Sequence, residues 1–195
     1  MFEMLGAMNK MKMRGDTTLE DLLTAEEMKR VEAYFEKENS MLPFSMLKTY
    51  KPFLAASMLT KNAVPCEGAT AMEQVIMEEA KKQKKDIKGM ETMAYQLSIF
   101  DTIPYKLQAQ QLLQYIDTAK ADSDDKMVEE LMENYKKQDL AKLEKMMSRS
   151  DMGIANFTDL LLYNRNRNWV KKLNTLLPGK IVVIAVGAGH LPGEN

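Results

Sequence analysis

The sequence predicts an α/β fold in which a mostly helical body packs on a small remnant of a central sheet, with strands near residues 86–90 and 180–186. Residues 181–186 form an unbroken apolar run rich in β-branched side chains and follow the turn Pro178-Gly179, which is typical of a strand buried on both faces. Residues 86–90 are too few for a helix and lead directly into Glu91. Apolar residues recur at helical spacing elsewhere, so well over half of the chain is expected to be helical.

Helical periodicity begins at the N-terminus, is interrupted at Gly15-Asp16 and a short acidic segment over residues 17–23, and resumes at Thr24. Thr24 and Glu27 form a capping box, which predicts a helix from there to about Glu38. Pro43 and Pro52 each suit a first helical turn, so two short helices at an angle are expected between residues 41 and 59. The residues expected on buried faces in this part are Met1, Met4, Met8, Met11, Met28, Val31 and Phe35.

The rest of the chain carries further helix signals in order. A capping box of Thr70 and Glu73 starts one helix, one or two helical turns follow over residues 92–100, and Pro104 starts a longer helix. Two more helices follow, capped at residues 122–123 and 139, and the longest is expected over residues 156–177. The expected buried stripes are Met72, Val75, Ile76 and Ala80; Ala109, Leu112, Leu113 and Ile116; Met127, Val128, Leu131, Met132 and Tyr135; Leu143 and Met147; Leu161, Leu162, Trp169, Leu173 and Leu176.

Composition excludes several classes of protein and leaves one domain over residues 1–195. Twenty-seven basic residues nearly balance 28 acidic ones, so no basic field exists to attract nucleic acid. No apolar run approaches the ~20 residues that cross a bilayer, so no transmembrane segment is expected. The single cysteine, Cys66, excludes an intrachain disulfide and a cysteine-cluster metal site, and it is expected to be a packed or loop residue.

Both predicted strands end at a residue with acid–base chemistry. Glu91 follows the first, and a glycine-rich turn places His190, the only histidine, after the second. Because chemistry in open α/β sheets sits at the carboxyl ends of strands, the two strands are expected to be adjacent, with like ends together. A purely structural histidine is the alternative at this position.

Arg165 is the arginine expected to join these two residues. It shares a helix face with Trp169 four residues later, whereas Arg167 points elsewhere. An arginine on an apolar stripe either meets an anion or extends its charged end to the surface. Since Pro178-Gly179 should reverse the chain tightly, the following strand would climb back along the helix. We therefore expect Arg165 within salt-bridge reach of Glu91, and His190 within one water of that pair.

Three stretches together carry a family resemblance. They are residues 88–92 (KGMET) with Gln96 after them, Arg165-Asn166 with Trp169, and residues 186–194 (VGAGHLPGE). These stretches resemble the TraB/GumN family, whose animal relatives are the Tiki-type membrane-anchored proteases. The last stretch is the most specific, and with residues 101–110 (DTIPYKLQAQ) the resemblance covers nearly all of the chain.

The resemblance implies a fold, an activity and a set of site residues. The family is recognised by two G-x-x-H motifs, a glutamate and an arginine at one end of a central sheet, and these correspond here to His190 for the second motif, Glu91 and Arg165. It implies a metal-dependent hydrolase that acts on a peptide or protein substrate. A divalent metal ion of unknown identity would be held by His190 and Glu91, and the catalytic residues would be Glu91, Arg165 and His190. Glu91 would act as ligand or general base, and Arg165 would pair with Glu91 or stabilise an oxyanion.

The resemblance also implies that this chain is a piece of a larger protein, truncated at both ends and inactive on its own. The first G-x-x-H is absent, and the family normally continues beyond Glu194. The parent protein is expected to be exported to the periplasm or cell surface, although nothing in this chain fixes its compartment. The alternative class is a non-catalytic binding protein for a peptide, a pheromone or a haem-like ligand, because methionine-rich helices make adaptable grooves and a histidine can ligate haem.

Overall fold

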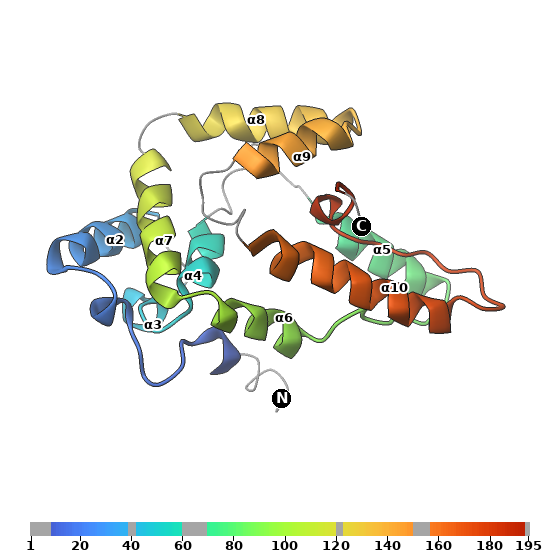
Figure 1. Ribbon diagram of the computed structural model, residues 1–195, viewed down its shortest axis with the longest axis horizontal. Helices are drawn as coiled ribbons and strands as arrows, with labels where there is room; N and C mark the ends of the chain where they lie inside the picture. The colour runs from blue at the N-terminus through green and yellow to red at the C-terminus, as the bar shows by residue number, and fades with distance from the viewer. Residues whose placement is uncertain (1–8, 39–41, 60–69, 120–122, 150–156, 194–195) are drawn as a thin grey trace.

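The chain folds as a succession of short helices joined by turns and extended segments (Figure 1). The computed structural model describes residues 9–38, 42–59, 70–119, 123–149 and 157–193. Its α-helices are α2 (Ala25–Lys37), α3 (Phe44–Leu47), α4 (Pro52–Leu59), α5 (Met72–Lys82), α6 (Met93–Ile99), α7 (Tyr105–Ala119), α8 (Ser123–Lys136), α9 (Leu140–Arg149) and α10 (Asn164–Leu176). Single 3-10 turns form η1 (Leu19–Asp21), η3 (Phe100–Thr102) and η6 (Ala188–His190), and a π-helical turn forms η5 (Asp159–Tyr163).

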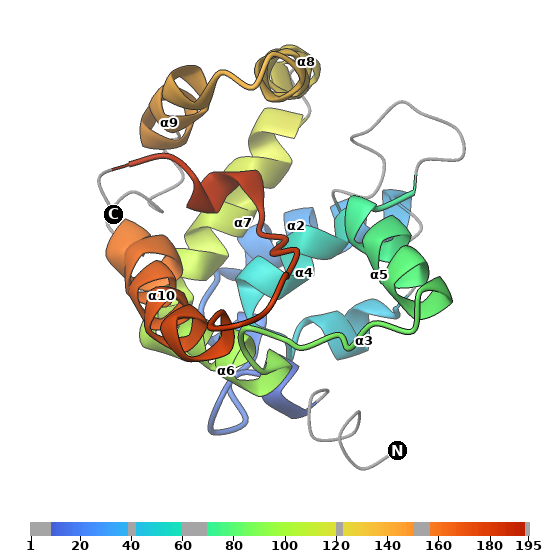
Figure 2. The same ribbon diagram turned by 90° about the vertical axis from the view of Figure 1, so that its right-hand side faces the viewer.

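The core lies where α7 packs against α2 and α4. One face of α7 is buried, as the sequence predicts, and Val31 and Phe35 of α2 are buried as predicted too. The hydrophobic cluster consists of Leu19, Leu23, Val31, Phe35, Leu47, Tyr50, Ala55, Ala109, Leu112, Leu113 and Ile116. This body carries α8 and α9 at one end and, through α6, the α10 region at the other (Figures 1 and 2).

Several helix starts follow the predicted local chemistry. The Thr24–Glu27 capping box is formed, with the Glu27 carboxylate accepting from the Thr24 amide at 2.8 Å. Pro43 directly precedes α3, and Pro52 is the first residue of α4, so each proline occupies a position where its missing N–H costs little. The predicted Thr70–Glu73 box is wrong, because α5 starts after Ala71 without a side-chain cap.

The predicted α/β fold with a sheet remnant is wrong, since the described residues contain no strand. Their nearest approach to β pairing is one isolated antiparallel bridge between Lys12 and Tyr50. Residues 86–90 and 180–186 are irregular, and no described residue hydrogen-bonds the backbone of 181–186. A strand forms only through a ladder with a neighbour, so high β propensity without a partner leaves this segment exposed, with Val183 85% accessible. The helical part of the prediction is confirmed, since 68% of the described residues are helical.

Two predicted buried stripes are also wrong. Met72 and Val75 of α5 are exposed, as are Leu131 and Tyr135 of α8. Helical spacing places these residues on one face but does not supply an element to cover it, and α5 lies at the edge of the molecule (Figure 2). The predictions for Met1, Met4, Met8 and Cys66 fall outside the described residues.

The predicted absence of a membrane-crossing segment agrees with the helices that the structure describes. None of them combines the length and the apolar character that crossing a bilayer requires.

Candidate functional site

Three segments far apart in the sequence converge beside α10. Glu91 ends the irregular segment that leads to α6, and Arg165 lies in the first turn of α10, directly after the π-helical turn η5. After α10 the chain turns at Gly179, which has a φ of +70°, and runs back along the helix to η6, whose last residue is His190 (Figure 1). The predicted reversal is therefore present, although the returning segment is not a strand.

Arg165 forms a forked ion pair with Glu91. Its Nε lies 3.0 Å from Oε2 and 3.2 Å from Oε1, and its Nη2 lies 2.8 Å from Oε2. The pair is sheltered, with side-chain exposures of 16% for Arg165 and 5% for Glu91. The Nη1 of Arg165 donates to the Leu161 carbonyl at 3.0 Å and lies 3.3 Å from Nε2 of His190. A guanidinium has five N–H groups, so one N–H on Nη2 is left for which the described residues provide no acceptor.

Asn166 fixes the ring of His190. The Asn166 Nδ2 donates to the His190 carbonyl at 2.9 Å. Because a carbonyl oxygen can only accept, the NH₂ group of the Asn166 amide must be the end that points to it. Its Oδ1 then lies 2.7 Å from Nδ1 of His190, which must carry the proton. The neutral ring therefore presents a bare Nε2, and this is the atom that faces the N–H donor of Arg165.

The indole of Trp169 packs against both His190 and Arg165. Its ring centroid lies 4.4 Å from that of His190, and the guanidinium carbon of Arg165 lies 5.1 Å from the indole centroid. This is cation–π range, and it confirms that Arg165 and Trp169 share a helix face. The Trp169 N–H is buried near Glu91 but makes no hydrogen bond of good geometry with a described residue.

The electrostatics of the cluster favour an ionised glutamate and a neutral histidine. Burial alone would raise the pKa of Glu91, but hydrogen bonds and charge from Arg165 outweigh it and hold the pKa below 4.5. Burial lowers the pKa of His190 below 6.5, and the Arg165 charge lowers it further, against a smaller opposing effect of Glu91. The cluster is thus built around one cation, the Arg165 guanidinium.

A groove of about 520 Å³ runs beside the cluster, between the start of α6 and α10. It is lined by Gly89, Met90, Glu91, Thr92, Tyr95, Asn168, Trp169 and Lys172. The Lys172 ammonium donates to the carbonyls of Gly89 and Met90 at 2.8 and 3.0 Å, which holds the segment before Glu91 against α10. Glu91 and Trp169 thus belong both to the cluster and to the wall of the groove, whereas Arg165 and His190 do not line it.

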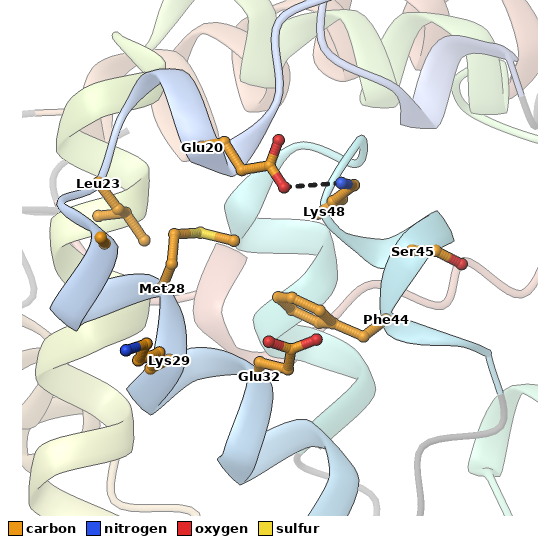
Figure 3. A pocket seen from close by; sticks show the side chains of 9 residues that line it. Glu20, Leu23, Met28, Lys29, Glu32, Phe44, Ser45 and Lys48 are labelled. Carbon is orange, nitrogen blue, oxygen red and sulfur yellow. Dashed lines mark hydrogen bonds and ion pairs between the residues drawn. The ribbon is translucent and has the colours of Figure 1, made fainter.

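A second hollow, of about 420 Å³, lies elsewhere, between η1, α2 and α3 (Figure 3). Leu23, Met28 and Phe44 give it apolar walls, and Glu20 and Lys48 pair at 2.7 Å at its edge. It contains no histidine or cysteine, and its charges are of both signs, so it offers no comparable set of reactive groups.

The described residues do not fit the expected metal centre. Among them, no group of three His, Cys, Asp or Glu side chains lies close enough to share an ion. The two expected ligands, Glu91 and His190, turn both carboxylate oxygens and Nε2 toward the guanidinium of Arg165. Nδ1 of His190 is bonded to Asn166, the arrangement that orients a metal-binding histidine, but this one feature does not make a site.

The predicted meeting of Glu91, Arg165 and His190 is confirmed as geometry, while their catalytic and metal-binding roles stay predictions. Arg167 points away, as predicted, and pairs with exposed Asp159 at 3.4 Å. The residue that sequence reasoning missed is Asn166. Its signal was its place directly after Arg165 in a stretch already noted for its resemblance, but its contact with a ring 24 positions away is visible only in the fold.

Comparison with known proteins identifies the family of this chain. The family model described as the TraB/PrgY/gumN family matches residues 1–195, so the chain belongs to this family. No curated protein and no solved structure matches the chain.

Proposed function

We propose, from the premise that the chain is a TraB/PrgY/gumN family member, that its site at Glu91, Arg165 and His190 hydrolyses peptide-like bonds. The observation that carries the proposal is the convergence of these residues, 74 and 25 positions apart in sequence, in one sheltered cluster. A sheltered arginine, a carboxylate and the only histidine of the chain, next to a groove, are what a polar reaction centre requires.

In this proposal, Arg165 stabilises the negative charge that develops during the reaction. Its fork to Glu91 fixes the plane of the guanidinium, and its remaining N–H on Nη2 can donate to the oxygen on which negative charge develops. Glu91 acts as a positioning residue, because both of its oxygens accept from Arg165.

In the same proposal, His190 accepts a proton. Its lowered pKa keeps the ring neutral at pH 7, and the proton on Nδ1, held by Asn166, leaves Nε2 as the basic atom. At 3.3 Å, the contact from Nε2 to Arg165 is longer than the contacts of Arg165 with Glu91 and Leu161, so water or substrate can replace it more easily than those. Participation of a divalent metal stays a prediction from the resemblance, and no step is derived through it.

The test is cleavage of a fluorogenic peptide library by the full chain and by matched variants. Arg165→Lys and His190→Gln should each reduce turnover at least about a hundredfold, since each removes a transition-state contact. Arg167→Lys changes a neighbouring arginine outside the cluster and should leave turnover unchanged. Turnover in the wild type that survives both cluster substitutions would contradict the proposal.

A second function, ligand binding without chemistry, is favoured by a specific observation. In the described arrangement, Arg165 satisfies both the carboxylate and the imidazole, so neither is left reactive. The groove, with Met90, Tyr95 and Trp169 in its walls, would then hold a peptide or pheromone. Haem is less well supported, because both ring nitrogens of His190 are engaged. Peptide binding that saturates without any cleavage would favour this second function.

A further inference from the structure

We infer that the guanidinium of Arg165 takes the place of a metal ion in this site and competes with divalent cations for Glu91 and His190. Carboxylate oxygen and neutral imidazole nitrogen are donors that divalent metals use. Here the same donors, both oxygens of Glu91 and Nε2 of His190, face Arg165 at 2.8–3.3 Å.

The geometry explains why the two cations exclude each other. A metal ion at Glu91 and His190 would lie between donors that now contact one guanidinium, and two like charges at that separation repel strongly in a sheltered site. Arg165 is also anchored by the Leu161 carbonyl at 3.0 Å and by the indole of Trp169. It therefore cannot leave Glu91 without losing several contacts at once.

Removal of the guanidinium should leave a prepared pair of donors. Asn166 would still hold the proton on Nδ1 and aim Nε2 of His190 at the space that the guanidinium now fills, as outer partners orient metal-binding histidines. Glu91 would lose its counter-charge and become a stronger attractor of cations. An uncharged residue at position 165 should thus increase metal affinity, although most substitutions in a binding site reduce it.

The experiment measures binding of Co²⁺ alone to the full chain by calorimetry and by the visible absorption of the bound ion. Arg165→Met and Arg165→Gln should bind Co²⁺ at least about tenfold more tightly than the wild type, because a like charge has been removed. Adding His190→Gln to Arg165→Met should abolish the gain, and Arg167→Met, which removes an exposed arginine, should match the wild type. Circular dichroism establishes that each variant is folded, and two substitutions at position 165 guard against a folding failure of either.

Two results would overturn the inference. One is Co²⁺ affinity of both folded Arg165 variants no higher than that of the wild type. The other is a gain in affinity that persists when His190 is also replaced. Because the readout is binding and not turnover, the inference stands or falls independently of the proposed hydrolysis.

Discussion

Asn166 holds His190 at two points, donating from Nδ2 to its carbonyl at 2.9 Å and accepting from its Nδ1 at 2.7 Å. The first contact fixes the orientation of the amide, and that orientation fixes which ring nitrogen carries the proton. One asparagine therefore determines the atom of His190 that faces Arg165.

The ionisation of His190 can be measured directly because it is the only histidine. Its imidazole signals in NMR should titrate with a pKa below 6.5, since burial and the Arg165 charge disfavour the imidazolium. Arg165→Met should move the pKa upward, toward the ordinary value. Below that pKa the ¹⁵N shifts should correspond to imidazolium, and above it to the Nδ1–H form. A wild-type pKa above 6.5, or a neutral ring protonated at Nε2, would contradict the geometry.

The same pKa shift predicts the pH dependence of stability. A histidine whose pKa is lower in the folded than in the unfolded chain leaves the unfolded state with more bound protons, so stability falls as pH falls below about 6.5. Glu91, also shifted downward, adds a further loss as pH falls below about 4.5. Urea unfolding between pH 7.5 and 4 measures both losses of stability. His190→Gln should remove only the loss that begins below about pH 6.5. An unchanged slope in that variant would assign the effect to other groups.

Two arginine ion pairs on α10 allow a matched comparison of stability. Glu91→Gln leaves a sheltered guanidinium without its counter-charge and should cost about 3 kcal/mol in the free energy of unfolding. Asp159→Asn breaks the Arg167 pair, whose side chains are 58% and 75% exposed, and should cost less than about 1 kcal/mol. Chemical denaturation of the two variants gives the difference. Similar losses for both would show that the Arg165 pair is as well solvated as the surface pair.

The choice of Arg165 over Arg167 shows what periodicity can predict. Both arginines lie in one helix and differ only in the direction in which they leave the helix axis. Arg165 forms a sheltered ion pair with Glu91, whereas Arg167 forms an exposed ion pair with Asp159. The buried face of α7 was predictable for the same reason. The position of Asn166 against His190 was not, because it depends on how a returning segment without secondary structure lies along α10.

The predicted sheet failed for a different physical reason. Local sequence reports the propensity of residues 181–186 to pair, but a strand also needs a neighbour, which no local pattern supplies. The exposure within the segment still alternates, with Val182 at 45% and Val183 at 85%, so it keeps the two faces of an extended chain.

This exposure predicts an unusual response to a charge in an apolar run. Val183→Lys should change the free energy of unfolding by less than about 0.5 kcal/mol, because the valine is almost fully accessible. It should also reduce self-association, since a charge interrupts an unpaired apolar segment of high β propensity. Light scattering and urea unfolding measure the two effects. A large loss of stability would mean that Val183 is buried against a partner in solution.

The last prediction concerns Gly193, whose backbone lies close to the phenol ring of Tyr163. Its φ is +98°, and a Cβ there would lie 2.8 Å from the hydroxyl oxygen of Tyr163 and 3.1 Å from its Cε1. Tyr163 ends η5, two residues before Arg165, so a displaced phenol ring would disturb the turn that starts the site. Gly193→Ala should therefore combine a left-handed backbone cost of about 1–2 kcal/mol with a steric clash.

Gly179→Ala is the matched control, because its φ is +70° but a Cβ there would meet nothing within 4 Å. It should show the backbone cost alone and leave the NMR pKa of His190 unchanged, whereas Gly193→Ala should shift that pKa toward its ordinary value as the cluster loosens. Equal losses of stability and an unmoved His190 in both variants would mean that the contact between Gly193 and Tyr163 does not support the site.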